Sequence, residues 1–143
     1  MAHREDRRAV LMSIHPRHAD KLLAGTKRVE LRKARFGADV SRVVVYATAP
    51  TKAVVGWLEV EAVEEHSPTR VWDMFGHTTG ISRREFRRYF NGRRRAVAIR
   101  VRRPRRLAAP MRLAELDPTL TAPQSFRYLP HAAAGRLWEQ PTG

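Results

Sequence analysis

The stretch that decides the fold is "KAVVGWLEVEAVEEH", residues 52–66. Its side chains alternate in character, with Val54 and Leu58 on one face and Trp57 and Glu59 on the other. A period of two is typical of a β-strand, and this run is long for a single strand. Gly56 lies inside it, and a glycine within a strand indicates a bulge or a bend. We therefore expect a sheet that curls, as in a small barrel.

The segments on either side of this strand predict further strands and helices. Apolar or alternating patterns typical of strands occupy residues 9–14, 27–32, 42–50 and 97–103. Helical patterns with capping residues occupy 16–25, 67–76 and 82–92, with weaker helical signals at 111–116 and 130–140. We expect Pro104 to end the strand that precedes it. We expect Phe86, Tyr89 and Phe90 to form the buried stripe of the helix at 82–92.

The order of these elements predicts an α+β domain. Strands and helices are interleaved without the strict βαβ repetition of a doubly wound parallel sheet. A chain of 143 residues is long enough to bury one sizeable core. We therefore expect a charged N-terminal arm at residues 1–8 and a single domain at residues 9–143.

The charge of the chain is its most informative total. Lysine and arginine number 28 and aspartate and glutamate 14, so the formal net charge is +14. Such an excess attracts polyanions, of which nucleic acid is the commonest in a cell. Arginine far outnumbers lysine, which the codon bias of a GC-rich genome would also produce. The chain has no cysteine, no secretory signal and no apolar run long enough to span a bilayer, so we expect a cytoplasmic protein without disulfides.

Arginines are concentrated between residues 83 and 106, where Glu85 is the single acidic residue. A charge run is usually a solvated face, but the local scarcity of acids favours a surface that contacts phosphates. We expect Arg84, Arg88 and Arg95 to contribute to it, because they lie off the expected buried stripe or just past the helix.

Four segments together resemble one protein family. "LMSIHPRHADKLLAGTKRVELRK" (11–33) resembles the opening of ASCH domains of the PUA-like superfamily, with a strand, "HP", a helix ending in "G-x-K" and a strand with an acidic residue and an arginine. Similar segments follow in order: "VVVYATAPTKAVVGWLEVEAV" (43–63), "GISRREFRRYFNG" (80–92) and "PQSFRYL" (123–129). The resemblance covers roughly residues 9–128. It implies a PUA-like small mixed β-barrel of about five or six strands with helices packed at its ends. It also implies a cleft between barrel and helices that binds RNA or modified nucleosides.

The first expected wall of that cleft is formed by Lys27, Glu30 and Arg32. Glu30 and Arg32 are two residues apart, so they share one face of an extended strand, and Lys27 precedes them where helix passes to strand. The two cations suit a phosphate or a base carbonyl, and Glu30 suits an exocyclic amine or a ribose hydroxyl. Spacing alone favours a solvated face with a weak ion pair, whereas the family motif favours a site.

Two further walls are expected from the matching segments. Tyr46 offers a stacking platform, and Lys52 follows a turn; core and surface roles for these two residues remain equally open. The third wall takes its residues from "PQSFRYL", where we assign Phe126 to packing. Its candidate binding residues are Ser125, Arg127 and Tyr128.

These residues favour a nucleic-acid-binding module, with RNA favoured over DNA. The alternative is a metal-independent hydrolase on the same scaffold, either a ribonuclease or an amidohydrolase of a modified nucleoside. A ribonuclease would use Tyr46, Lys52 and Ser125 as catalytic residues with assistance from Lys27. The amidohydrolase pattern has a threonine three residues after its lysine, where this chain has Glu30.

The sequence predicts no metal ion and no cofactor. His15 and His18 have a spacing that can bind zinc, but no third ligand with suitable spacing follows. No phosphate-binding loop, dinucleotide fingerprint or nucleophile elbow is present.

Overall fold

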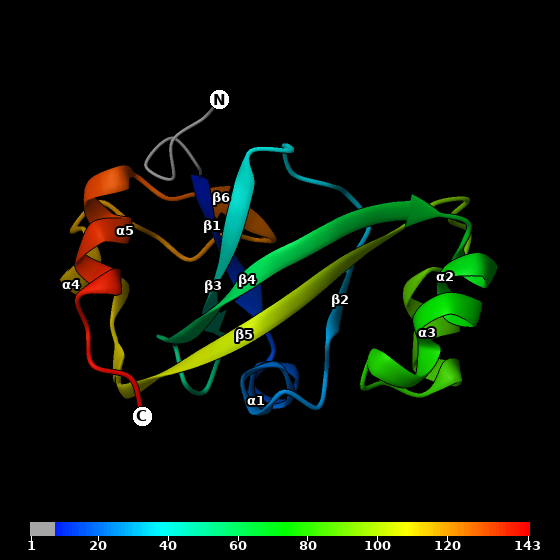
Figure 1. The fold of residues 1–143 in the computed structure, drawn as a ribbon, viewed down its shortest axis with the longest axis horizontal. Coiled ribbons are helices and arrows are strands. Elements are labelled where there is room, and N and C mark those ends of the chain that lie inside the picture. Colours follow the sequence, from blue (N-terminus) through cyan, green and yellow to red (C-terminus); the bar gives the residue numbers. More distant parts are fainter. Residues whose placement is uncertain (1–7) are drawn as a thin grey trace.

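The computed structural model describes residues 8–143, which form a six-stranded mixed sheet with helices around it (Figure 1). The strands are β1 (Arg8–Ile14), β2 (Val29–Arg32), β3 (Val40–Ala47), β4 (Ala53–His66), β5 (Ala96–Met111) and β6 (Phe126–Tyr128). The helices are α1 (Pro16–Ala24), α2 (Pro68–Phe75), a 3-10 turn η2 (Gly76–Thr78), α3 (Arg83–Tyr89), α4 (Leu113–Leu116) and α5 (His131–Trp138). Residues 1–7 of the expected N-terminal arm lie outside the described residues.

The strand order across the sheet is β2-β5-β4-β3-β1-β6. β1 and β3 pair in parallel, and all the other neighbours are antiparallel. The segment that contains Phe126 adds the short edge strand β6 to β1, and the Phe126 ring packs edge-on against Phe36 at 5.8 Å. The expected packing role of Phe126 is therefore confirmed.

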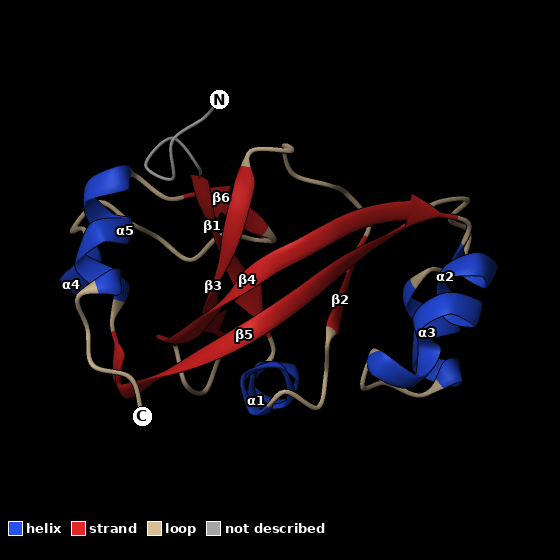
Figure 2. Cartoon of the chain, viewed as in Figure 1, coloured by secondary structure: helices blue, strands red, loops and turns tan. Residues whose placement is uncertain are grey.

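β4 and β5 form a long antiparallel pair that crosses the sheet diagonally, and α2, η2 and α3 lie in the connection between them (Figure 2). Its register shifts at three places, one of them between Val54 and Gly56. A Cβ atom at Gly56 would clash with the carbonyl oxygen of Arg105 and lie 2.7 Å from a methyl group of Leu23, so only glycine fits there. The shifts bend the strands and curl the sheet into a half-barrel, which confirms the predicted α+β, PUA-like fold.

Helices pack at both ends of the curled sheet. α4 and α5 lie at one end, α2 and α3 at the other, and α1 lies between them below the sheet (Figure 1). One core cluster joins α1 to the sheet through Leu22, Val45 and Ile99. The opposite face of the sheet packs against α4 and α5, and a third cluster joins β2 to α2 and α3. None of the helices in residues 8–143 is long and apolar enough to span a membrane.

Two local expectations are corrected by the structure. Pro104 does not end its strand, because β5 continues to Met111. Leu58 of β4 lies opposite a bulge formed by Arg103 and Pro104, where the missing N–H group of proline costs no ladder hydrogen bond. Tyr89 is not part of the buried stripe either, since it is 37% exposed while Phe86 and Phe90 are buried.

Candidate functional site

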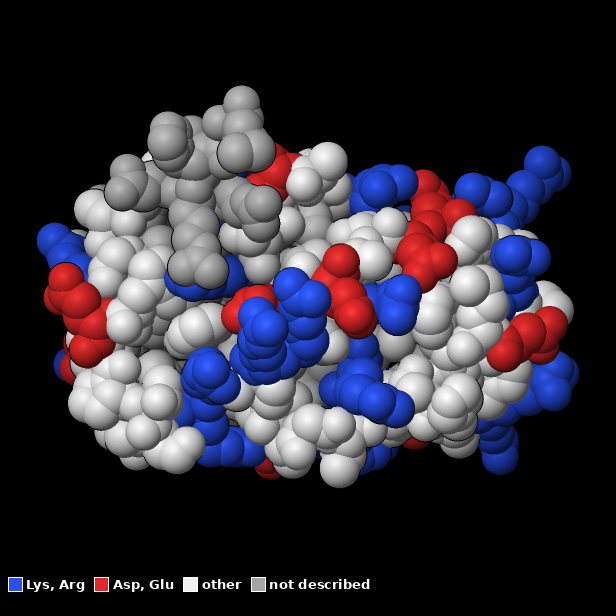
Figure 3. Space-filling view, viewed as in Figure 1, with Lys and Arg blue, Asp and Glu red and all other residues white. Residues whose placement is uncertain are grey.

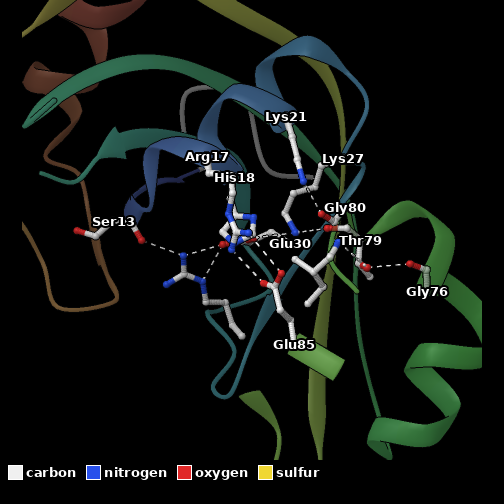
Figure 4. A network of polar contacts seen from close by, with 12 residues as sticks. Ser13, Arg17, His18, Lys21, Lys27, Glu30, Gly76, Thr79, Gly80 and Glu85 are labelled. Carbon is white, nitrogen blue, oxygen red and sulfur yellow. Dashed lines mark hydrogen bonds and ion pairs between the residues drawn. The ribbon is translucent and has the colours of Figure 1, made fainter. Parts of the chain in front are cut away.

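A buried ion network occupies the space between α1, β2 and the segment that connects η2 to α3 (Figure 4). The Glu30 carboxylate accepts two hydrogen bonds from the Arg32 guanidinium, at 2.7 and 3.1 Å. Its other oxygen lies 3.5 Å from the Lys27 ammonium. The side chains of Lys27, Glu30 and Arg32 are 2%, 10% and 13% exposed. The structure thus brings the three residues of the first predicted wall together, and we call them the ion network.

Local geometry places Lys27 in this network. α1 ends at Gly25, whose left-handed φ of 82° turns the chain back toward β2. The Lys27 ammonium then donates to the carbonyl of the buried residue Thr79, and Lys21 donates to the carbonyl of Gly80 at 2.8 Å. The two lysines therefore hold the segment that leads into α3 against α1.

A cavity of about 220 Å3 opens above the ion network. Ile14, Leu31 and Ile81 give it apolar walls, and the half-exposed ring of Tyr89 forms one side. We call it the inner cavity, and its lining residues are Ile14, His15, His18, Lys27, Glu30, Leu31, Arg32, Ile81, Glu85 and Tyr89. An ion pair between Arg17 of α1 and Glu85 of α3, at 3.0 Å, joins the two helices beside it.

Burial and pairing set the charge states in the ion network. Burial raises the pKa of Glu30, but Arg32 and Lys27 more than offset this and hold that pKa below its usual value of 4.5. Burial lowers the pKa of Lys27 despite the neighbouring Glu30. Near neutral pH Glu30 is therefore a carboxylate between two cations, and it is an acceptor only.

His18 presents a hydrogen-bond donor beside the network. Its Nε2 atom lies 3.3 Å from the guanidinium of Arg17, which can only donate, so Nε2 accepts and Nδ1 carries the proton. Burial, Lys27 and Arg17 lower the pKa of His18, which favours this neutral form. The Nδ1 atom is buried and has no hydrogen-bond partner among residues 8–143. His15 instead accepts the Arg17 backbone N–H at 3.2 Å and caps α1.

Of the second and third predicted walls, Ser125 reaches the ion network. Its hydroxyl lies 3.3 Å from the Arg32 guanidinium, and its carbonyl accepts the N–H of Ser13 at 3.0 Å. Tyr46 lies opposite Ser13 in the pairing of β1 with β3. Its buried ring belongs to the core cluster that packs against α4 and α5, on the face of the sheet away from the ion network. Lys52 is exposed after the turn that follows β3, and its φ of 50° is unusual for a residue with a side chain.

Arg127 and Tyr128 do not line the inner cavity. Arg127 is exposed on β6. The hydroxyl of Tyr128 accepts the N–H of Gly37 at 2.8 Å, and the guanidinium of Arg8 stacks 3.7 Å from the centre of its ring. Tyr128 therefore holds the loop before β3 in place.

The predicted arginine surface divides into two parts. Arg84 and Arg88 of α3 are exposed and form no hydrogen bond or ion pair with other described residues, whereas Arg95 donates to the carbonyl of Glu65 at 3.2 Å. Three arginines of β5 face acids of β4, which are remote in the sequence. These pairs are Arg100 with Glu61 and Glu64, and Arg102 and Arg103 with Glu59. We call them the strand ladder, and basic and acidic side chains gather together over β4 and β5 in Figure 3.

His18 and Tyr89 were not predicted as ligand-binding residues. The aromatic spacing of α3 indicated burial for Tyr89, but the helix leaves that edge open toward the inner cavity. The spacing of His15 and His18 suggests a metal pair and gives no sign of a hydrogen-bond donor for a base. No group of three or more histidine, aspartate or glutamate side chains arranged to hold a metal ion occurs within residues 8–143.

Comparison with known proteins identifies relatives over most of the chain. A family model described as a domain of unknown function (DUF365) matches residues 8–117. An ASCH domain-containing ribonuclease of Zymomonas mobilis is 31% identical over 127 residues, which cover 87% of this chain and 86% of that protein.

Solved structures agree with the sequence match. The crystal structure of ASCH from Zymomonas mobilis superposes with a TM-score of 0.88 at 28% identity and covers 96% of this chain and 98% of that one. A YTH domain of Zygosaccharomyces rouxii, solved in complex with N6-methyladenosine RNA, has a TM-score of 0.50 at 12% identity, covers 97% of this chain and 89% of that chain, and shares the fold alone. The family model, the sequence relative and the crystal structure agree: this chain belongs to the ASCH domain family of the PUA-like superfamily.

Proposed function

We propose that this protein binds single-stranded RNA and takes one base into the inner cavity. The observation that carries the proposal is the cavity itself, which combines apolar walls, a tyrosine edge and a charged floor in about 220 Å3. Water occupies roughly 30 Å3 per molecule in the liquid, so the cavity has room for only a few water molecules. A ligand that fills it is therefore about as large as a single base. The relative named a ribonuclease and the fold shared with an RNA-bound YTH domain support RNA as the ligand.

The side chains around the cavity suit a base in chemical type. Tyr89, whose ring centre lies 4.6 Å from the Lys33 ammonium, offers an aromatic ring for stacking, and Ile14 and Ile81 offer apolar contact to the base. The Nδ1–H group of His18 and the guanidinium of Arg32 donate, while the Glu30 carboxylate accepts. A base edge carries both donors and acceptors, so it can satisfy the otherwise unpartnered nitrogen of His18.

The exposed arginines of α3 suit the backbone of the same strand. Arg84 and Arg88 lie on the helix that also contributes Tyr89 to the cavity, and Arg95 follows shortly after it. Because other described residues do not neutralise Arg84 and Arg88, phosphates can pair with them on binding.

Fluorescence anisotropy with a labelled single-stranded RNA tests this proposal. We expect binding that weakens with salt by a log–log slope of roughly −0.7 per neutralised phosphate. Tyr89→Ala should weaken binding by about 1–3 kcal/mol, or roughly 5- to 150-fold. With an RNA of about 3 nucleotides, Tyr128→Ala is the matched control, since this tyrosine lies outside the cavity. An unchanged affinity in Tyr89→Ala would refute the assignment of the cavity.

Ribonuclease activity is a second candidate, favoured by the relative that is named a ribonuclease. Cleavage without a metal ion requires a base, a cation and a proton donor around the scissile phosphate. We propose that Tyr46, Lys52 and Ser125 supply these groups outside the inner cavity, since the Tyr46 ring lies on the opposite face of the sheet and Lys27 is buried in the ion network. The left-handed backbone of Lys52 adds support, because such strain is often retained at functional sites.

In this reaction the 2′-hydroxyl of the substrate loses its proton and its oxygen attacks the adjacent phosphorus. The bond to the 5′-oxygen breaks, that oxygen takes a proton, and a 2′,3′-cyclic phosphate remains. Cleavage should therefore survive EDTA and be lost in Lys52→Ala, in Tyr46→Phe and with a 2′-deoxy substrate. Equal activity in the parent and both variants would show that a contaminant is responsible.

A further inference from the structure

A second hollow of about 560 Å3 lies away from the inner cavity, between α5, the first residues of β1 and β3, and the middle of β4 and β5. Its basic lining residues are Arg8, Arg42, Arg102 and Arg103. We call it the outer groove. None of its lining residues contributes to the inner cavity, and the function proposed above does not use it.

An unusual backbone brings two consecutive arginines to this groove. Successive side chains of a strand normally point to opposite faces of the sheet. Arg102 and Arg103 instead approach the same Glu59 oxygen, at 3.6 and 3.2 Å. The β-bulge at this point and the left-handed φ of 51° at Arg103 produce this arrangement. Such a conformation costs of order 1 kcal/mol or more in a residue with a side chain, so its presence points to a role for the paired guanidinium groups.

The groove has more basic than acidic side chains. Glu59 is its single acidic lining residue within the described chain, and its carboxylate serves both Arg102 and Arg103. Arg8 pairs with Asp39 at 3.8 Å near one end of the groove. The side chains of Arg102 and Arg103 are 50% and 62% exposed, so they can reach a ligand while they remain paired.

An aromatic wall closes the groove on the side of α5. Trp138 of α5 packs edge-on against Trp57 of β4, with ring centres 4.9 Å apart. The guanidinium of Arg42 lies 4.8 Å from the Trp57 ring centre and 4.4 Å from that of Trp138. Stacking on two rings holds this cation in a fixed position beside the groove.

We propose that the outer groove binds backbone phosphates of the RNA strand whose base occupies the inner cavity. The proposal rests on the function proposed above and extends its footprint to a second region of the molecule. A furrow of about 470 Å3 shares Ser41 and Val60 with the outer groove and is also lined by Arg35. The furrow is also lined by the acids Asp39 and Glu61, and Arg35 pairs with Glu65 at 3.7 Å, so the arginines of the outer groove, and not the furrow, carry the proposal.

RNAs of two lengths separate the groove from the cavity. An oligonucleotide of about 3 nucleotides fills the inner cavity alone, whereas one of about 12 nucleotides can span both regions. In Arg102→Ala/Arg103→Ala the long RNA should bind about tenfold more weakly at low salt, with a log–log salt slope reduced by roughly 1.4 for two lost phosphate contacts. The short RNA should bind as it does to the parent protein.

Two further variants test the groove, one as a control outside it and one that should strengthen binding. Arg105→Ala/Arg106→Ala removes two positive charges from the same strand outside the groove, and it should leave the difference between the two RNAs unchanged. Glu59→Gln removes the competing carboxylate, so it should tighten binding of the long RNA by a few-fold and leave the short RNA unaffected.

An NMR readout reports the groove directly. The chain has three tryptophans, and Trp138 alone among them lines the groove, so its indole N–H signal should shift with the long RNA and not with the short one. Two results would overturn the proposal for the groove while leaving that for the cavity intact. One is a long-RNA affinity that is the same in the parent and in Arg102→Ala/Arg103→Ala. The other is a Trp138 signal that shifts equally in both proteins when the long RNA binds. Failure of the parent to bind either RNA would overturn both proposals.

Discussion

The ion network and the strand ladder contain the same kinds of residue in opposite surroundings. In the ion network, Glu30 is paired to Lys27 and Arg32 with all three side chains at most 13% exposed. In the strand ladder, the side chains of Glu59 and its partners Arg102 and Arg103 are 25% to 62% exposed. Buried partners cannot separate without leaving a charge that water does not stabilise, whereas exposed partners can exchange one another for a phosphate. The first group therefore shapes a site, and the second is available to bind along a strand.

The largest expected effect comes from removing the carboxylate at the centre of the ion network. Glu30→Ala leaves two buried cations without their counter-charge, which typically costs about 3–5 kcal/mol. We expect the midpoint of urea unfolding to fall accordingly, measured against the parent protein.

Glu59→Ala is the matched control on the strand ladder. It removes the same type of ion pair from an exposed position, so it should change the free energy of unfolding by less than about 1 kcal/mol. Equal losses in the two variants would contradict the distinction between the two groups.

Acidification should weaken the fold through two groups that line the inner cavity, Glu30 and His18. Folding lowers the pKa of Glu30 below 4.5, so its stabilising contribution is present above that pH and is lost as the pH falls through the folded value. Folding also lowers the pKa of His18 below 6.5, so stability starts to decline as the pH falls below 6.5.

Unfolding measured from pH 7 to pH 3 distinguishes these groups. His18→Gln should remove the decline that begins near pH 6.5, because glutamine does not titrate. A profile that is the same in the parent and in His18→Gln would contradict the proposed charge state of His18.

A smaller effect is expected at the two left-handed residues that carry side chains. Lys52 and Arg103 have φ values of 50° and 51°, and glycine adopts this conformation without strain. Lys52→Gly and Arg103→Gly should therefore each stabilise the fold by up to about 1 kcal/mol. The first should lose RNA cleavage and the second should lose affinity for long RNA. Lower stability together with full activity would argue against a functional origin of this strain.

Local spacing predicted part of the fold and of the candidate site. The alternation at 52–66 and Gly56 indicated a curled sheet, because both features act within one strand. Glu30 and Arg32 were expected to share a face, since side chains two apart on a strand do so. The capping residues of α1, α2 and α3 predicted where these helices begin, because a cap also acts between residues that are close in the sequence.

Features that depend on distant segments were not predictable in this way. The arginines of β5 have few acidic neighbours along the sequence, but not in space. Pairing with β4 places Glu59, Glu61 and Glu64 opposite them. The exposure of Tyr89 depends on how far α3 lies from α1, which no local pattern encodes. The strand continues through Pro104 because a bulge, set by pairing with β4, accepts the proline.

A crystal structure of the protein with a short single-stranded RNA, made resistant to cleavage by 2′-deoxy substitution, would show directly whether the inner cavity holds a base. We expect one base inside the inner cavity, stacked on Tyr89 and within hydrogen-bonding distance of the Nδ1 atom of His18 or the guanidinium of Arg32. RNA bound elsewhere on the protein, with the cavity empty and the ion network untouched, would contradict it.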